Sequence, residues 1–291
     1  MMLDFFSYDF IRFALAASLL GSITAGIIGT YVVTRRMVFI TGGITHASFG
    51  GLGLGFFLGI NPLLGAAVFG LISGVGVEYL SRFHKIREDS VIAMVWSFGM
   101  ALGIIFISLS PGYAPNLMSY LFGNILSVSS QDLWIMAILL MLVLALFIPF
   151  FRLIQYATFD EDFARTSRVP VSLFKYLLAA LVALTAVVYI RVAGIILVLS
   201  LLTIPQNTAL LFSNNLKKIM WLSVGIGFLG SLLGLTISYA WDIPSGASII
   251  FSLVILYLAG SAGKTIFKAR KKSKLQIELP AKLNLKEKNK S

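Results

Sequence analysis

Long apolar runs alternate with short polar links along almost the whole sequence. A helix needs roughly 20 apolar residues to cross a bilayer core about 30 Å thick, and many runs approach this length. The runs lie near residues 10–34, 43–59, 62–80, 91–110, 133–151, 172–190, 194–212, 219–240 and 245–263. This pattern predicts an all-α integral membrane protein, a polytopic bundle of about eight or nine transmembrane helices.

The run at 43–59 leaves the number of spans open, because it is short and rich in glycine. It is either a full span or a broken, re-entrant segment. Gly51, Gly55 and Gly59 recur every four residues and fall on one helix face. Small residues let membrane helices approach closely, so plain helix packing is the first interpretation. The alternative is packing that leaves a central path for a solute.

Composition excludes several classes of protein. Hydrophobic residues make up 58% of the 291 residues and charged residues 12%, which is too little charge to cover a soluble domain. The absence of cysteine excludes disulfides and thiolate metal sites. No Walker-type phosphate loop, HExxH or GxSxG motif is present, and a GxGxxG match at 225–230 lies inside an apolar run. We therefore expect neither an enzyme nor a stably bound cofactor.

The net charge of +11 is interpreted as a topology signal rather than as nucleic-acid binding. Lysine and arginine stay on the cytoplasmic side of a membrane. If alternate links share one side, all but Arg12 and Arg191 of the 23 basic residues lie there. This places the N-terminus outside and the C-terminus inside. We expect a transmembrane domain at 1–264 with a cytoplasmic insert at 152–171, and a basic, disordered tail at 265–291 that suits anionic lipid.

His46 is the first candidate for chemistry at membrane depth. It lies at the start of the second run, directly after Thr45 and close behind the basic pair Arg35 and Arg36. Ionisable residues in a membrane are costly and face protein or water, and imidazole ligates zinc, manganese and iron. A hydrogen-bonded structural histidine is the competing interpretation.

Two other polar segments are candidates for a solute pathway. Pro205 interrupts the seventh run and is followed by Gln206 and Asn207. Proline kinks a helix, and irregular polar backbone at membrane depth faces either protein or a wet cavity. A purely structural kink is the alternative. Asp242 lies in an external turn, either as a helix cap or as part of an outer mouth.

A charged amphipathic segment occupies residues 159–171 in a cytoplasmic link. It is predicted to be either a short helix that docks on a soluble partner or a solvated loop. The candidate docking residues are Asp160, Glu161, Phe163, Ala164 and Pro170.

These segments together resemble the permease subunits of bacterial ABC importers for zinc, manganese and related divalent metals, the ABC-3 family. The matching stretches are Thr34–Met37, Gly43–Ala47, Tyr120–Leu126, Phe159–Val171, Gly194–Ala209 and Asp242–Ala247. They occur in the family's order and cover nearly the whole chain apart from the tail.

The resemblance implies a type II importer-like fold in the bacterial cytoplasmic membrane. It implies a homodimer that works with two cytoplasmic ATPases and an extracytoplasmic metal-binding protein. The transported ion would be zinc or manganese, with iron as a further option. His46, Thr45, Asn207 and Asp242 would then meet the passing metal, and residues 160–170 would couple to the ATPase.

Two positions depart from the family's pattern. Gly42 stands where the family usually has an aspartate, four residues before His46, and Arg168 stands where it often has glycine. Without the carboxylate, one span no longer offers two metal ligands on one face. Transport of a metal chelate or another small solute therefore stays open. A channel or secondary carrier is the third alternative, although the span centres lack the carboxylates that ion-coupled carriers use.

Overall fold

The computed structural model describes residues 9–83, 87–110, 123–159, 161–166 and 170–288, and every regular element within them is helical, as predicted. The elements are α2 (Asp9–Thr34), α3 (Val38–Phe57), α4 (Pro62–Phe83), α5 (Glu88–Leu109), the 3-10 helix η1 (Ile125–Ser127), α7 (Ser130–Phe159), α8 (Glu161–Thr166), α9 (Val171–Leu201), α10 (Ile204–Leu210), α11 (Leu216–Trp241) and α12 (Ser245–Lys288).

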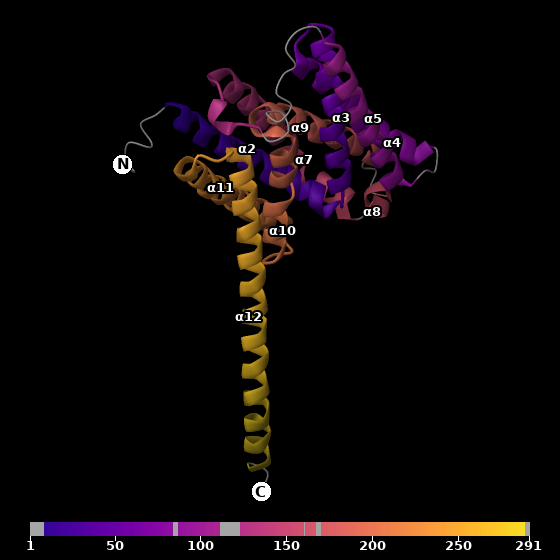
Figure 1. Ribbon diagram of the computed structural model, residues 1–291. Helices are drawn as coiled ribbons and strands as arrows, with labels where there is room; N and C mark the ends of the chain where they lie inside the picture. The colour runs from indigo at the N-terminus through magenta and orange to yellow at the C-terminus, as the bar shows by residue number, and fades with distance from the viewer. Residues whose placement is uncertain (1–8, 84–86, 111–122, 160, 167–169, 289–291) are drawn as a thin grey trace.

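The helices form two groups that share α9. Helices α3, α4 and α5 pack together on one side, and α2, α11 and α12 pack together on the other (Figure 1). Helix α9 contacts members of both groups and is the most deeply buried of the long helices. The bundle therefore has its core around α9, and the outer faces of α5, α7 and α12 carry exposed apolar side chains that suit lipid.

Turn residues set the boundaries on both sides of α3. Before it, Arg36 adopts a left-handed conformation with φ 59°, which breaks the helix after the basic pair. After it, Gly59 has φ +67° and no neighbour that a side chain would meet, and Pro62 then opens α4, where a missing backbone N–H costs nothing. The apolar sequence thus folds into two antiparallel helices joined by a tight turn.

Close backbone contacts explain the glycines of α3. At four of them, an added β-carbon would overlap the backbone of a neighbouring helix. These contacts set Gly51 against Gly65 and Gly55 against Pro62 on α4, and Gly50 against Gly99 and Gly53 against Gly103 on α5. The packing interpretation of Gly51 and Gly55 is confirmed, whereas Gly59 belongs to the turn.

Helix α9 is broken at Gly194, whose φ of 75° and ψ of 162° are not helical. Thr185 and Val198 line one small cavity together with Ala25 and Leu202. In a straight helix, Thr185 and Leu202 would lie about 25 Å apart along the axis, at 1.5 Å per residue. The chain therefore turns back at Gly194, at the boundary between the predicted runs 172–190 and 194–212, and the segments on either side of it lie next to each other.

Six helical segments in the described part of the chain are long and apolar enough to cross a membrane. They are Asp9–Thr34, Asp89–Leu109, Ser130–Phe159, Val171–Leu210, Leu216–Trp241 and Ser245–Phe267. Helix α3 is not among them, and α4 contributes only a shorter apolar stretch, Pro62–Val77. Length and hydropathy therefore support a multi-pass membrane protein, but they do not confirm eight or nine spans.

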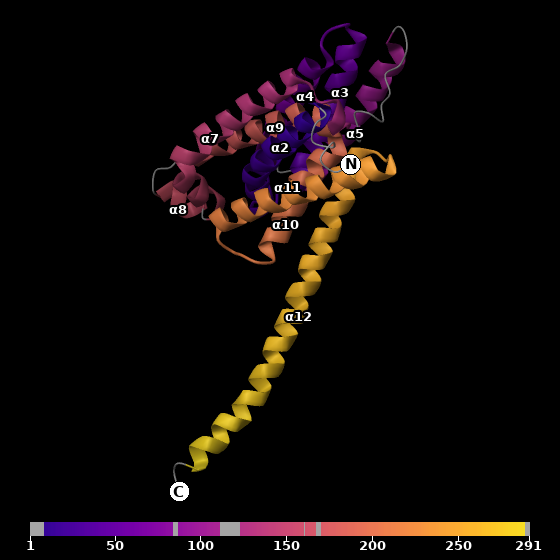
Figure 2. The same cartoon turned by 90° about the vertical axis from the view of Figure 1, so that its left-hand side faces the viewer.

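The C-terminal segment continues α12 as a helix to Lys288 and projects away from the bundle (Figure 2). The sequence predicted a disordered tail at 265–291, whereas the structure is helical there up to Lys288. The division of the chain after residue 264 stays a prediction.

Candidate functional site

His46 lies in the buried stretch of α3, and its ring stacks on Trp96 of α5. The ring centroids are 4.1 Å apart and the planes differ by 9°. The Nδ1 atom is buried and forms no hydrogen bond with any described residue. The structural interpretation therefore lacks its hydrogen bond at this atom among the described residues, and the ligand role of His46 stays a prediction.

Thr45 does not add a free ligand beside His46. Its hydroxyl is buried and donates a hydrogen bond to the Gly42 carbonyl oxygen at 2.9 Å. This bond closes within the helix itself, so Thr45 stabilises α3 locally. A pathway role for Thr45 stays a prediction.

Gly42 has room for a side chain. An added β-carbon would lie 3.5 Å from Cζ3 of Trp96 and 3.9 Å from the methyl carbons of Leu199, which are ordinary contact distances. Trp96 therefore flanks both Gly42 and His46, which are one helical turn apart. The carboxylate is absent because residue 42 is glycine, although the space beside it would accept a β-carbon.

Pro205 differs from the expected mid-helix kink. It lies in the first turn of α10, after a break at Thr203 with φ −129° and ψ −50°. Proline is well tolerated there because the first N–H groups of a helix have no partner within it. The polar residues thus begin a new helix after a break instead of surrounding a kink within a continuous span.

Gln206 and Asn207 point in different directions from α10. Gln206 is fully buried, and its Nε2 donates to the carbonyl oxygens of Ala25 at 2.7 Å and Leu201 at 3.1 Å. Asn207 is exposed and its Nδ2 donates to the Thr203 carbonyl oxygen at 2.8 Å. Gln206 therefore joins α10 to α2, and Asn207 faces outwards.

The predicted pathway residues do not gather in one place. Helix α3 packs mainly on α4, α5 and α9, whereas α10, with Asn207, packs mainly on α2, α11 and α12. Asp242 lies beyond the far end of α11, whose 26 residues span about 39 Å at 1.5 Å per residue. Among the described residues, no group of three or more His, Asp or Glu side chains is placed to hold a metal.

Asp242 has the geometry of a helix cap. It ends α11 in a left-handed conformation with φ 52° and ψ 46°, which aspartate tolerates better than most residues. The Ser238 hydroxyl donates to the Ile243 carbonyl oxygen at 2.6 Å across the same turn. This matches the cap interpretation, while a part in the outer mouth stays a prediction.

The charged insert forms the short helix α8, as one of the two interpretations predicted. Ala164 is completely buried against Ala157 and Val171 of the same chain. Ala164 thus supports α8 from inside and offers no docking surface, which corrects its expected role. Pro170 is exposed at the start of α9.

The other expected coupling residues are described only in part. Asp160 and Arg168 lie outside the described residues. The backbone of Glu161 and Phe163 belongs to α8.

Arg35 was not predicted as a site residue, although its basic pair stood out in the sequence. Its guanidinium donates to the carbonyl oxygens of Ala157 at 3.1 Å and Thr158 at 3.4 Å. The last carbonyls of a helix lack partners within it, so Arg35 caps α7 directly before α8. The signal in the sequence was only a basic pair after an apolar run, which does not reveal its partner.

The opposite end of α7 takes part in an ion pair that the sequence did not reveal. Arg191 Nε lies 3.0 Å from Asp132 Oδ1, and the Asp132 side chain is only 6% exposed. Arg12 lies 3.5 Å from Asp9. The two basic residues that departed from the expected charge asymmetry are therefore both paired with carboxylates.

Comparison with known proteins gives a consistent result over almost the whole chain. The sequence model of the ABC 3 transport family matches residues 7–264. An uncharacterized membrane protein of Synechocystis, slr2045, is 39% identical over 261 residues, which cover 90% of this chain and 93% of that protein. The manganese transport system membrane protein MntC of Halalkalibacterium halodurans is 33% identical and covers 86% of each chain.

A solved structure shares the arrangement of helices. The structure of PsaBC from Streptococcus pneumoniae in complex with a Fab superposes with a TM-score of 0.80 at 32% identity. The match covers 89% of this chain and 95% of that one.

Proposed function

Because the chain belongs to the ABC 3 transport family, we propose that it is the membrane-spanning permease of an ATP-binding cassette importer. Its cargo is a divalent metal ion, with manganese favoured over zinc and iron. The observation that carries this proposal is the match over residues 7–264 together with a relative named for manganese transport. ATP hydrolysis is the task of a separate subunit, since the chain has no phosphate loop.

The proposal includes an assembly of two permeases, two cytoplasmic ATPases and an extracytoplasmic metal-binding protein. It also includes nine crossings of the bacterial cytoplasmic membrane. In this count α3 and α4 each cross once, and the turn at Gly194 divides the apolar stretch Val171–Leu210 into two crossings. An odd number of spans places the two termini on opposite sides, and the basic links then place the N-terminus outside and the C-terminus inside.

His46 is the residue that we expect to meet the passing ion. Stacking on Trp96 fixes the plane of the imidazole, and a buried Nδ1 without a partner is available inside the protein. Since Gly42 adds no carboxylate, water or backbone carbonyl groups complete the shell of the ion. Binding is then weak, which suits a pathway, because a site that holds its ion tightly releases it slowly.

Metal transport and the role of His46 are tested by measuring the uptake of manganese and zinc by proteoliposomes that contain the complete complex. His46→Ala is expected to lower manganese uptake roughly tenfold, the equivalent of about 1.4 kcal/mol, with unchanged assembly and basal ATP hydrolysis. Gly42→Asp adds a carboxylate one turn away and is expected to increase metal retention and slow turnover. Full uptake by His46→Gln would show that the imidazole is no ligand.

A metal chelate is the alternative cargo, favoured by the absent carboxylate at Gly42. A chelated ion brings its own ligands and needs none from α3. In that case free manganese would not stimulate ATP hydrolysis by the complex, whereas the chelate would, and His46→Ala would leave its uptake unchanged.

A further inference from the structure

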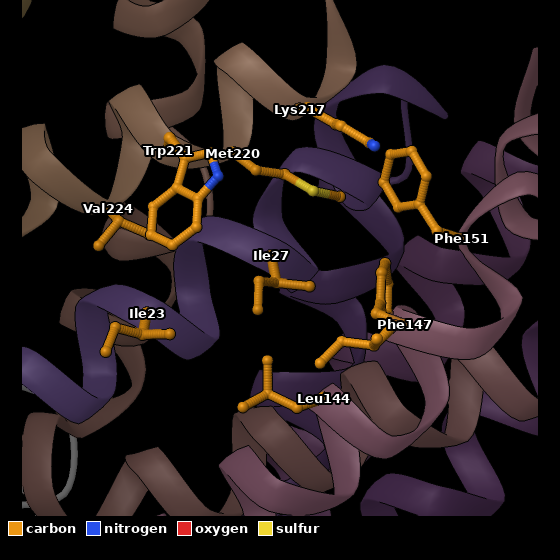
Figure 3. A pocket seen from close by; sticks show the side chains of 10 residues that line it. Ile23, Ile27, Leu144, Phe147, Phe151, Lys217, Met220, Trp221 and Val224 are labelled. Carbon is orange, nitrogen blue, oxygen red and sulfur yellow. The ribbon is translucent and has the colours of Figure 1, made fainter.

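An apolar cavity of about 470 Å³ lies between α2, α7 and α11, away from His46. Its volume is within the range of about 300–1,000 Å³ that is usual for small-molecule sites. Ile27, Leu144, Phe147 and Met220 form its walls, and the amine of Lys217 lies at its edge (Figure 3). A single basic group beside an apolar cavity fits an amphipathic ligand with an anionic head.

Lys217 is held at this edge by an aromatic ring. Its Nζ lies 5.1 Å from the centroid of the Phe151 ring, within the distance at which a cation is attracted by the face of the ring. Lys217 is exposed and has no salt bridge with another described residue, so a phosphate is able to bind there without displacing an ion pair.

The depth of the cavity matches the inner half of a membrane. Lys217 and Phe151 lie at the end of the bundle where Arg35 caps α7, and the lysine pair marks this end as cytoplasmic. Trp221, one turn along α11, is 76% exposed, and tryptophan is enriched at the membrane interface. From Lys217 to Val224 the lining extends about 10 Å towards the membrane centre, at 1.5 Å per residue.

We propose that this cavity binds one anionic phospholipid of the inner leaflet. An acyl chain lies between α2, α7 and α11, and the phosphate contacts Lys217. Basic pockets between membrane helices on the cytoplasmic side have the charge that such lipids require. A neutral phospholipid fills the same apolar cavity but gains less from the lysine. The inference does not depend on the cargo, so it is tested without transport.

The test is native mass spectrometry of the purified full-length protein with phosphatidylglycerol or phosphatidylcholine. Phosphatidylglycerol is expected to bind about fivefold more tightly, the equivalent of ~1 kcal/mol for one lysine at a membrane surface. Lys217→Gln should abolish this preference. Lys218→Gln is the matched control, because it removes the same charge from the next residue, which does not line the cavity.

A second variant tests the apolar part of the site. Leu144→Trp fills the cavity and should weaken binding of both lipids while Lys217 is intact. Equal effects of Lys217→Gln and Lys218→Gln would reduce the preference to general surface charge and overturn the proposal. Full competition by free glycerol phosphate would also overturn the proposal. The same holds for a change of subunit number in Leu144→Trp, because it would indicate that a second copy of the chain occupies the cavity.

Discussion

Replacing Arg35 with alanine removes the side-chain hydrogen bonds by which, in the described part of the chain, the α2–α3 turn is linked to the end of α7. In the described structure the guanidinium holds the carbonyl oxygens of Ala157 and Thr158. Helix α8, the proposed contact with the ATPase, begins directly afterwards. Arg35 therefore ties α8 to the turn that leads into α3 and His46, and its loss should loosen α8 and weaken coupling.

The free energy lost in Arg35→Ala follows from the geometry of its two hydrogen bonds. A hydrogen bond from a charged donor contributes about 1.5–3 kcal/mol, and the low end applies because Arg35 is only half-buried and its second contact is long, at 3.4 Å. A local loss of ~1.5 kcal/mol corresponds to about tenfold faster amide exchange. Hydrogen exchange should therefore rise about tenfold near the end of α7 and in α8.

The assay pairs this exchange measurement with two activities of the complete complex. Arg35→Ala should retain basal ATP hydrolysis but transport fewer metal ions for each ATP hydrolysed. Arg36→Asn is the matched control, because it removes a neighbouring positive charge from an exposed side chain, and asparagine tolerates the left-handed backbone at φ 59°. Unchanged exchange in Arg35→Ala, or an equal loss of coupling in Arg36→Asn, would show that Arg35 does not hold α8 in place.

Two further predictions concern the opposite end of the bundle and the topology. Asp132→Asn leaves Arg191 without its 3.0 Å partner and should destabilise the protein by ~1–2 kcal/mol, since Arg191 is partly exposed and water screens part of the loss; an unchanged melting temperature in detergent would contradict this. Reporter enzymes fused at Ser7 and Ser291 should report opposite sides of the membrane, and reports from the same side would require an even number of spans.

The helices themselves could be predicted from local sequence, because each has a cause within a few residues. Apolar runs of sufficient length require helices in lipid, where every backbone polar group must find a partner. The break before α4 was predicted between the runs 43–59 and 62–80, although Gly59 was assigned to a helix face and instead belongs to the turn. The non-helical Gly194 lies at the boundary between the two predicted runs, although hydropathy alone joins them into one stretch of 40 residues.

The roles of individual polar residues could not be predicted in the same way, because they depend on partners distant in sequence. Ala164 is one of the small residues of a charged insert, and only its contacts with Ala157 and Val171 show that it faces inwards. Gln206 donates to Ala25, which is 181 positions away. No local pattern encodes such a partner.

Local sequence was sufficient to predict that this protein is helical and crosses a membrane several times, and it also predicts that the basic links share one side. These properties depend on hydropathy and charge, which are properties of each segment alone. Three other features became visible only in the folded chain. His46 stacks on Trp96, and its Nδ1 has no hydrogen-bond partner among the described residues. Asn207 lies on α10, outside the α3–α5 group, and an apolar cavity opens beside Lys217. These features arise where helices meet, and helix packing is set by the fit of many side chains at once.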